Sequence, residues 1–167
     1  DNRIDEEVYD ILRKLVIKRA KLRAMHLLSD MGRTESQLRT KLKQGGYPDE
    51  AVEEAIRYVK SFGYINDAEY VRSFIDSRKE KKSKKEIYAA LKQKGVDSDI
   101  IEQVFEEMDY GEEDSRQAIE ALMRKRNYNP DSADLKEKQK LMGYLMRKGF
   151  RYEEVNSVLN SADSDIW

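Results

Sequence analysis

The sequence lacks cysteine altogether and contains one histidine, two prolines and eight glycines among its 167 residues. Without cysteine, the chain has no disulfides, no thiolate metal ligands and no thiol nucleophile. The single histidine, His26, has no second histidine with which to form a metal site. Walker, GxGxxG and GxSxG motifs are absent as well. We therefore expect a protein that is not an enzyme and that needs no cofactor.

Long apolar runs are also missing from the sequence. No stretch reaches the about 18 apolar residues that could cross a membrane, and no signal-peptide pattern occurs. We therefore expect a cytoplasmic protein with no membrane contact. Charged residues make up 39% of the chain, against about 25% in an average soluble protein. Because glycine and proline are scarce too, this composition predicts an all-α protein.

The chain contains three copies of one pattern. Residues 35–59, 84–108 and 138–162 align without a gap, and each copy has a central glycine. Apolar residues four apart mark one face of a helix on either side of that glycine. We expect the glycine to end the first of these helices in the left-handed conformation, with the apolar residue after it packing back against the helix. The three pairs are Gly46 and Tyr47, Gly95 and Val96, and Gly149 and Phe150.

A further helix precedes each copy, at residues 20–28, 68–78 and 118–126. Capping boxes that begin at Thr34 and Ser83 predict the start of the second helix in the first two repeats. Asp67 and Asp114 are the predicted N-caps of the helices that open the second and third repeats.

The predicted fold class is all-α, with three tandem three-helix repeats that form an elongated, curved array. A repeat of about 50 residues is marginally stable alone, so neighbouring repeats must share a core. The predicted boundaries are an N-terminal amphipathic extension at residues 1–19 that continues the first helix, repeat 1 at 20–66, repeat 2 at 67–114 and repeat 3 at 115–167. We expect the protein to be a monomer.

Charge alternates along the repeats, although the net charge of the whole chain is only −1. Residues 18–43, 78–94 and 116–148 carry net charges of +6, +6 and +5, whereas residues 47–70, 97–114 and 149–167 carry −4, −9 and −3. The first two helices of each repeat are therefore basic and the third is acidic. Stacked repeats would present a basic stripe that attracts nucleic-acid phosphates or an acidic protein groove, less strongly as salt rises.

The densest basic segment is residues 78–85. We expect Lys84 and Lys85 in the first turn of a helix, where cations oppose the helix dipole unless an anion binds. The alternative is that these charges form a solvated face or pair with the acidic helices inside the fold. The candidate residues for binding a partner or DNA are Arg23, Arg33, Arg39, Lys43, Arg72, Arg78, Lys79, Lys81, Lys82, Lys84, Lys85, Lys92, Arg124, Lys125, Arg126 and Lys148.

Three stretches of the sequence resemble a known family. They are residues 19–52 (RAKLRAMHLLSDMGRTESQLRTKLKQGGYPDEAV), 63–67 (GYIND) and 83–101 (SKKEIYAALKQKGVDSDII). These stretches resemble RecX, the family of bacterial modulators of the RecA recombinase, and the resemblance extends over residues 19–159.

The resemblance implies a non-enzymatic, negative modulator of RecA. Such a protein would bind the groove of the RecA filament on single-stranded DNA, with possible direct contact to the DNA. It would restrain filament growth, ATP hydrolysis, strand exchange and the co-protease activity of the SOS response. Two other classes stay open: a helical-repeat protein that binds nucleic acid directly, and a helical-repeat adaptor for another protein. Steep salt dependence of binding to naked DNA would favour the first of these.

Overall fold

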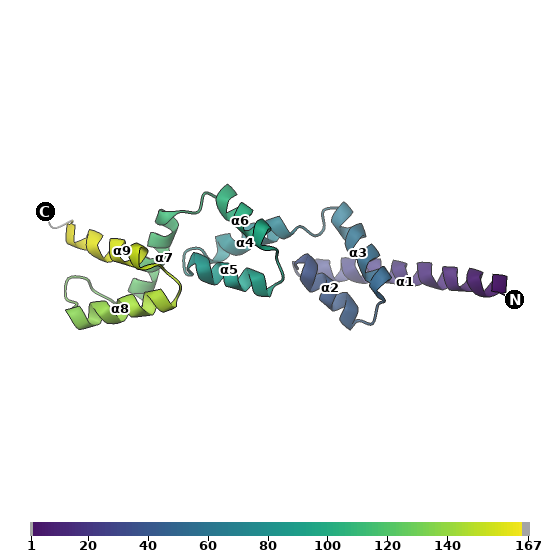
Figure 1. The fold of residues 1–167 in the computed structure, drawn as a ribbon, viewed down its shortest axis with the longest axis horizontal. Helices are drawn as coiled ribbons and strands as arrows, with labels where there is room; N and C mark the ends of the chain where they lie inside the picture. The colour runs from purple at the N-terminus through teal and green to yellow at the C-terminus, as the bar shows by residue number, and fades with distance from the viewer. Residues whose placement is uncertain (1, 165–167) are drawn as a thin grey trace. The chain divides into compact units, whose positions relative to one another are not determined.

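The computed structural model describes the backbone of residues 2–164 and, in that range, every side chain except those of residues 2, 4 and 161–164. Residues 2–164 form helices and connecting turns without a strand (Figure 1). The helices are α1 (Asn2–Asp30), α2 (Glu35–Gln44), α3 (Asp49–Ser61), α4 (Asp67–Arg78), α5 (Lys84–Gln93), α6 (Ser98–Glu107), α7 (Glu112–Lys125), α8 (Leu135–Arg147) and α9 (Tyr152–Ser164). The predicted all-α fold of three three-helix repeats is confirmed.

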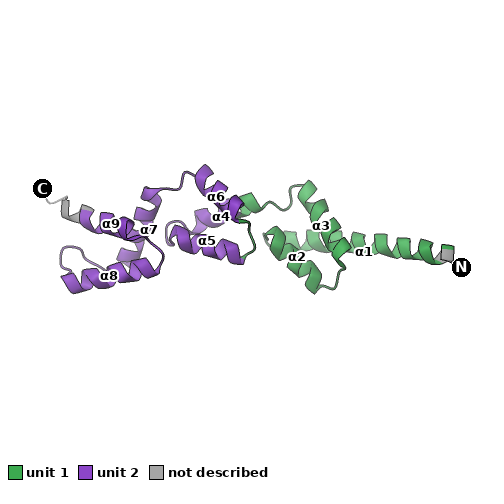
Figure 2. Cartoon of the chain, viewed as in Figure 1, with its two compact units in different colours: residues 1–70, 94–97 green, residues 71–93, 98–167 purple. Residues whose placement is uncertain are grey.

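The chain divides into two compact units (Figure 2). Unit 1 contains residues 1–70 and 94–97, and unit 2 contains residues 71–93 and 98–167. The division by repeat, with boundaries after residues 19, 66 and 114, rests on sequence periodicity and stays a prediction.

In unit 1, α1 packs against α2 and α3 around one apolar core. Ala20 and Ala24 of α1 are completely buried, and so is Ala55 of α3. Small side chains let two helices approach closely, and the larger apolar residues of α2 and α3 fill the remaining space. The buried members of this core in α2, α3 and the turn after α3 are Leu38, Leu42, Ala51, Val52, Ala55, Ile56, Val59 and Ile65.

The predicted amphipathic extension continues α1 without a break, as expected. Its apolar side chains nevertheless stay 44–65% exposed at Val8, Ile11, Leu12 and Leu15. A side-chain contact ties this half of α1 to α3: Arg13 Nε donates to Glu50 Oε1 at 2.7 Å. The guanidinium lowers the pKa of the Glu50 carboxyl below its ordinary value.

In unit 2, a core formed by α7, α8 and α9 contains Ala118, Ile119, Leu122, Met123, Leu141, Leu145, Phe150, Val155, Val158 and Leu159. Helices α4, α5 and α6 bury a second set of apolar side chains: Val71, Phe74, Ile75, Ile87, Leu91, Ile101, Val104 and Phe105. The four-residue spacing of Ile87 and Leu91 in α5, and of Leu141 and Leu145 in α8, is the stripe that the sequence predicted.

The glycine stops are confirmed. The φ angles of Gly46, Gly95 and Gly149 are +87°, +81° and +104°, in the left-handed region that glycine enters most easily. After two of these glycines, the backbone N–H of the next residue donates to a carbonyl of the preceding helix. The Tyr47 N–H donates to the Leu42 carbonyl at 3.4 Å, and the Phe150 N–H donates to the Leu145 carbonyl at 3.2 Å. These are the hydrogen bonds of a Schellman ending.

Capping was predicted correctly at α2 and only partly elsewhere. Thr34 forms the full box with Gln37 at the start of α2. At α5, the Ser83 hydroxyl accepts the Glu86 N–H at 3.1 Å, which is the serine half of the predicted box.

The prediction that Asp67 and Asp114 are N-caps was wrong. Asn66 caps α4 by accepting the Glu69 N–H at 3.2 Å, and Asp67 is the first residue inside that helix. Asp114 is the third residue of α7, and its carboxylate accepts the Gly111 N–H at 3.0 Å. The cap positions are taken by Asn66 at α4 and by Gly111 at α7.

The hydroxyl groups that cap α2 and α5 each donate a hydrogen bond to a carbonyl of the following repeat as well. We call each of these two hydrogen bonds a clasp. In unit 1, Thr34 Oγ1 donates to the Lys94 carbonyl at 2.7 Å. In unit 2, Ser83 Oγ donates to the Lys148 carbonyl at 2.6 Å. Both accepting carbonyls directly precede a left-handed glycine, Gly95 or Gly149. Equivalent residues of successive repeats therefore meet through equivalent hydrogen bonds.

The glycine in each clasp has a steric role in addition to its φ angle. A Cβ at Gly95 would overlap the side chain of Ser36, and a Cβ at Gly149 would lie 2.7 Å from Ser83 Oγ. At Gly46 a Cβ would meet nothing within 4 Å. Gly95 and Gly149 are thus required by close packing, whereas Gly46 is required only by its backbone conformation.

Candidate anion-binding surface

The predicted basic residues are divided unequally between the two units. Arg23, Arg33, Arg39 and Lys43 belong to unit 1, and the other twelve candidates belong to unit 2. A continuous basic stripe along the whole chain would cross both units and stays a prediction.

In unit 1, the candidate cation Arg39 forms ion pairs within the fold. Arg39 Nε on α2 donates to Glu53 Oε1 on α3 at 2.8 Å, and Arg39 also lies 3.9 Å from Glu35. The hydrogen bond lowers the pKa of the Glu53 carboxyl and raises that of the Arg39 guanidinium. Arg33 donates to the Leu27 carbonyl at 3.4 Å. Arg39 therefore fits the alternative in which basic and acidic helices pair within the fold.

Part of the basic set in unit 2 is also held by neighbours. Arg72 on α4 contacts Glu107 on α6 at 3.0 Å, and Lys79 lies 3.5 Å from Asp76. The Arg78 guanidinium stacks 3.7 Å from the centre of the Phe74 ring. Their charges still contribute to the local potential, but part of it is cancelled by adjacent carboxylates.

Lys84 and Lys85 occupy the first turn of α5, as predicted. Both side chains are exposed, and Lys84 Nζ lies 5.1 Å from the centre of the Phe105 ring. The first turn of a helix already carries a partial positive charge from its free N–H groups. Two ammonium groups there raise the positive potential further, which favours a bound anion.

A cleft of about 360 Å³ lies in unit 2, close to this helix start. We call it the basic cleft. Four lysines and three residues with apolar surface, which we call its floor, line the cleft, and the lining side chains include no carboxylate and no amide. The residues that line it are Lys81, Lys82, Ala121, Leu122, Lys125, Tyr144 and Lys148.

The cations of the basic cleft are only weakly compensated. Lys82 lies 3.6 Å from Glu86, whereas Lys81 and Lys125 form no ion pair with any described residue. Lys148 Nζ is 5.6 Å from the centre of the Tyr144 ring, and the Arg126 guanidinium stacks on the same ring at 3.9 Å. Like charges gathered in a concave surface focus a positive potential outward and attract anions.

Three segments of the chain build the basic cleft and hold it in place. Lys81 and Lys82 lie in the turn between α4 and α5, Lys125 ends α7, and Lys148 caps the C-terminus of α8. Leu122 is 8% exposed and belongs to the core of α7, α8 and α9. The clasp from Ser83 to the Lys148 carbonyl joins the turn to the end of α8. The lysines therefore project from an ordered base.

The sequence identified the lysines of this cleft but missed its floor. Ala121 and Leu122 lie in the helix predicted at residues 118–126 and Tyr144 lies in the repeat copy at 138–162, but nothing in their spacing distinguishes the lining of a cleft from a core. Lys92 and Arg124 are exposed and lie outside the lining of the cleft. All sixteen candidates remain predicted partner contacts, and the structure groups four of them into one site.

Three other features of the described residues bear on function. A hollow of about 500 Å³ in unit 2 is lined by glutamates, arginines, a serine and a valine, and Arg151 contacts Glu154 there at 2.7 Å. No group of three or more histidine, aspartate or glutamate side chains among residues 2–164 is arranged to hold a metal ion. Within the same range, no helix combines the length and apolar character needed to span a membrane.

Family models for three consecutive domains match the chain in order. The model for "RecX, first three-helix domain" matches residues 20–58, the second-domain model matches residues 66–104 and the third-domain model matches residues 112–159. The first match lies within predicted repeat 1, whereas the second begins one residue and the third begins three residues before the predicted start of its repeat.

Proteins called "Regulatory protein RecX" are similar over most of the chain. The one from Caldanaerobacter subterraneus is 35% identical over 144 residues, which cover 86% of this chain and 70% of the relative. The one from Clostridium perfringens is 29% identical over 162 residues, covering 95% and 76%. The one from Mycobacterium avium is 31% identical over 137 residues, covering 80% and 78%.

Solved structures share the fold. The crystal structure of RecX from Lactobacillus salivarius matches with a TM-score of 0.74 at 23% identity, over 89% of this chain and 97% of that chain. A second crystal structure, of regulatory protein RecX, matches with a TM-score of 0.79 at 24% identity, over 90% and 76%. At this level of identity the likeness concerns the fold.

Proposed function

Because the chain belongs to the RecX family of regulatory proteins, we propose that it is a negative modulator of RecA. In this proposal the chain binds the groove of the RecA filament on single-stranded DNA and restrains filament growth. Slower ATP hydrolysis, reduced strand exchange and reduced SOS co-protease activity follow from that restraint. The modulator acts in the cytoplasm, as a binding protein without a cofactor.

The observation that carries the proposal is the presence of three RecX three-helix domains in tandem. Tandem helical repeats offer an extended binding surface because each repeat adds contacts of the same kind. The weakly compensated lysines of the basic cleft in unit 2 supply positive charge toward a filament whose DNA is an array of phosphates. A binding protein changes the behaviour of a filament through unequal affinity for its states, so no catalytic group is required.

The test is the rate of ATP hydrolysis by RecA on single-stranded DNA as the chain is added. We expect hydrolysis to slow at amounts of chain below one per RecA, because each bound chain restrains the growth of a whole filament. Unchanged hydrolysis at saturating chain would contradict the proposal. Binding to DNA without any effect on RecA would support the direct nucleic-acid-binding class instead.

A charge-reversal pair tests which part of unit 2 faces the filament. Changing Lys84→Glu and Lys85→Glu together alters the local charge by about −4 at two exposed positions and should weaken inhibition of RecA. The matched control is Lys136→Glu with Lys140→Glu on α8, whose side chains are also exposed. The difference between the pairs should shrink at high salt, where the Debye length falls to about 3 Å. Equal inhibition by the two pairs would remove the start of α5 from the interface.

A further inference from the structure

The composition of the basic cleft is unusual for a site that receives a protein segment. Its lining side chains offer twelve or so ammonium N–H donors from four lysines, one tyrosine hydroxyl, and otherwise only apolar surface. No lining carboxylate or side-chain amide is present to accept a hydrogen bond. The site therefore suits a ligand that presents acceptors and negative charge, and few donors.

A DNA backbone has this character. Its phosphodiester oxygens are charged acceptors, its ester and ring oxygens are acceptors, and deoxyribose within a strand carries no hydroxyl donor. A peptide would bring one N–H group per residue into the cleft, and each N–H left without an acceptor or water costs about 1–3 kcal/mol. An acidic peptide is therefore the less suitable occupant.

The apolar floor and the size of the cleft agree with this occupant. The apolar surface of Ala121, Leu122 and the Tyr144 ring can contact the hydrocarbon face of a deoxyribose, while the four lysines that line the same cleft bind the phosphates on either side. A volume of about 360 Å³ holds a short piece of one strand. Lysine contacts phosphate as a point charge and does not need the fixed geometry of arginine.

Charged residues of both signs adjoin the lysines of the cleft. Glu80 directly precedes Lys81 in the turn before α5, and Glu86 on α5 neutralises part of Lys82. On α7 and α8 the charged residues next in sequence to the lining lysines are Arg124, Arg126 and Arg147, which add positive potential. A cleft in which Lys81 and Lys125 lack ion pairs gains most from an incoming anion, because no internal salt bridge has to break first.

From these observations we propose that the basic cleft of unit 2 is a binding site for the phosphodiester backbone of DNA. This proposal rests on the proposed function and extends it, because the cleft would let the chain bind DNA directly in addition to RecA. The cleft would bind DNA without sequence specificity, because contacts to the DNA backbone do not distinguish the bases.

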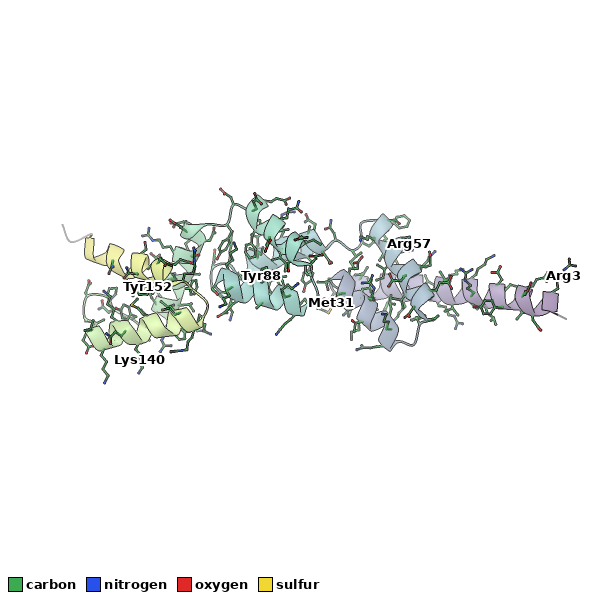
Figure 3. All side chains as sticks on the ribbon, viewed as in Figure 1. Arg3, Met31, Arg57, Tyr88, Lys140 and Tyr152 are labelled. Carbon is green, nitrogen blue, oxygen red and sulfur yellow. The ribbon has the colours of Figure 1, made fainter. Side chains whose placement is uncertain are left out.

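The experiment compares two charge-neutralising pairs in the full chain. Lys81→Gln with Lys125→Gln removes two cations of the cleft, and Lys136→Gln with Lys140→Gln removes two exposed cations of α8 that do not line it. Lys140 projects from the outer side of α8 (Figure 3). Binding of fluorescein-labelled oligothymidylate, and of a labelled duplex of equal length, is followed by anisotropy over a range of salt. Circular dichroism checks that both variants keep their helices.

We expect the cleft pair to lower affinity for oligothymidylate by about tenfold or more, as the loss of charge-assisted hydrogen bonds implies. The slope of log K against log salt should fall by about 1.4, which corresponds to two phosphate contacts on a single strand. The control pair should change affinity less than about twofold. Comparison of the single strand with the duplex tells which form of DNA the cleft prefers.

Any one of three results would overturn the proposal. Equal losses for the cleft and control pairs would mean that only net charge matters. Displacement of the oligonucleotide by polyglutamate as effective as displacement by an unlabelled strand of equal charge would assign the cleft to an acidic peptide. None of these results contradicts the proposed function, because inhibition of RecA by the parent chain is measured separately. If the parent inhibits RecA but the cleft pair binds DNA normally, this site fails and the regulatory function stands.

Discussion

The clasp predicts a difference between two glycines that sequence alignment treats as equivalent. Gly46 and Gly95 both have a φ angle above +80° and both end the second helix of a repeat. A Cβ added at Gly46 meets open space, whereas a Cβ at Gly95 overlaps the side chain of Ser36. Substituting each with alanine therefore separates the effect of backbone conformation from the effect of close packing.

The expected magnitudes follow from these contacts. Gly46→Ala should lower the free energy of unfolding by about 1 kcal/mol, the cost of holding alanine in the left-handed region. Gly95→Ala adds displacement of Ser36, which costs about 1–3 kcal/mol as overpacking does. It also strains the Thr34 to Lys94 hydrogen bond, worth about 1 kcal/mol. The total at Gly95 is about 3–5 kcal/mol, so the two variants should differ by at least about 2 kcal/mol.

The assay is urea unfolding followed by far-ultraviolet circular dichroism, with Ser36→Gly as the second arm of a double-mutant cycle. Ser36→Gly removes the atoms that a Cβ at position 95 would overlap. In that background Gly95→Ala should cost about 1 kcal/mol, close to Gly46→Ala in the parent. If Gly46→Ala and Gly95→Ala cost the same in the parent, the close approach at Gly95 is wrong, and so is the clasp.

Two further predictions concern individual contacts. Ser83→Ala removes the hydrogen bond to the Lys148 carbonyl and the cap of α5, so the free energy of unfolding in urea should fall by about 2 kcal/mol. The control Ser29→Ala removes only a hydrogen bond to the His26 carbonyl in its own helix and should cost much less. Equal losses of stability in the two variants would contradict the role of Ser83. The Arg39 guanidinium holds the pKa of the Glu53 carboxyl below its ordinary value. This pair therefore stabilises the fold fully at pH values above the pKa of a free glutamate, about 4.3, and the stabilisation is lost as the pH falls through the lowered pKa. Arg39→Gln should raise the pKa of Glu53 in a carbon-detected NMR titration, and an unchanged pKa would show that the pair does not form in solution.

The glycine stops and the Thr34 cap could be predicted because they depend on local chemistry. A left-handed residue after a helix calls for glycine whatever surrounds it, and a threonine three residues before a glutamine forms its box within one turn. The same local rules failed at Asp67, where Asn66 caps α4. The Asp67 carboxylate instead accepts the Glu35 N–H at 2.9 Å, across 32 residues of sequence. No local pattern contains that contact.

The candidate site was predictable in its charges and not in its geometry. The sequence placed Lys81, Lys125 and Lys148 in basic segments, but they come together only because the end of α7 and the end of α8 pack beside the turn after α4. The opposite happens at Arg39, which belongs to the same predicted set and contacts Glu53 on the neighbouring helix. Which cation is compensated depends on the packing of helices, and a charge count along the chain cannot resolve it.

The central claim is that this chain restrains RecA filaments, and net filament growth tests it most directly. Fluorescently labelled RecA is allowed to extend filaments on single-stranded DNA, and the growth rate is measured as the chain is added in amounts well below that of RecA. We expect growth to slow or reverse at these amounts, and we expect the Lys84→Glu, Lys85→Glu variant to be needed in larger amounts for the same effect. Growth that continues at the parent rate with the chain in excess over RecA would contradict it.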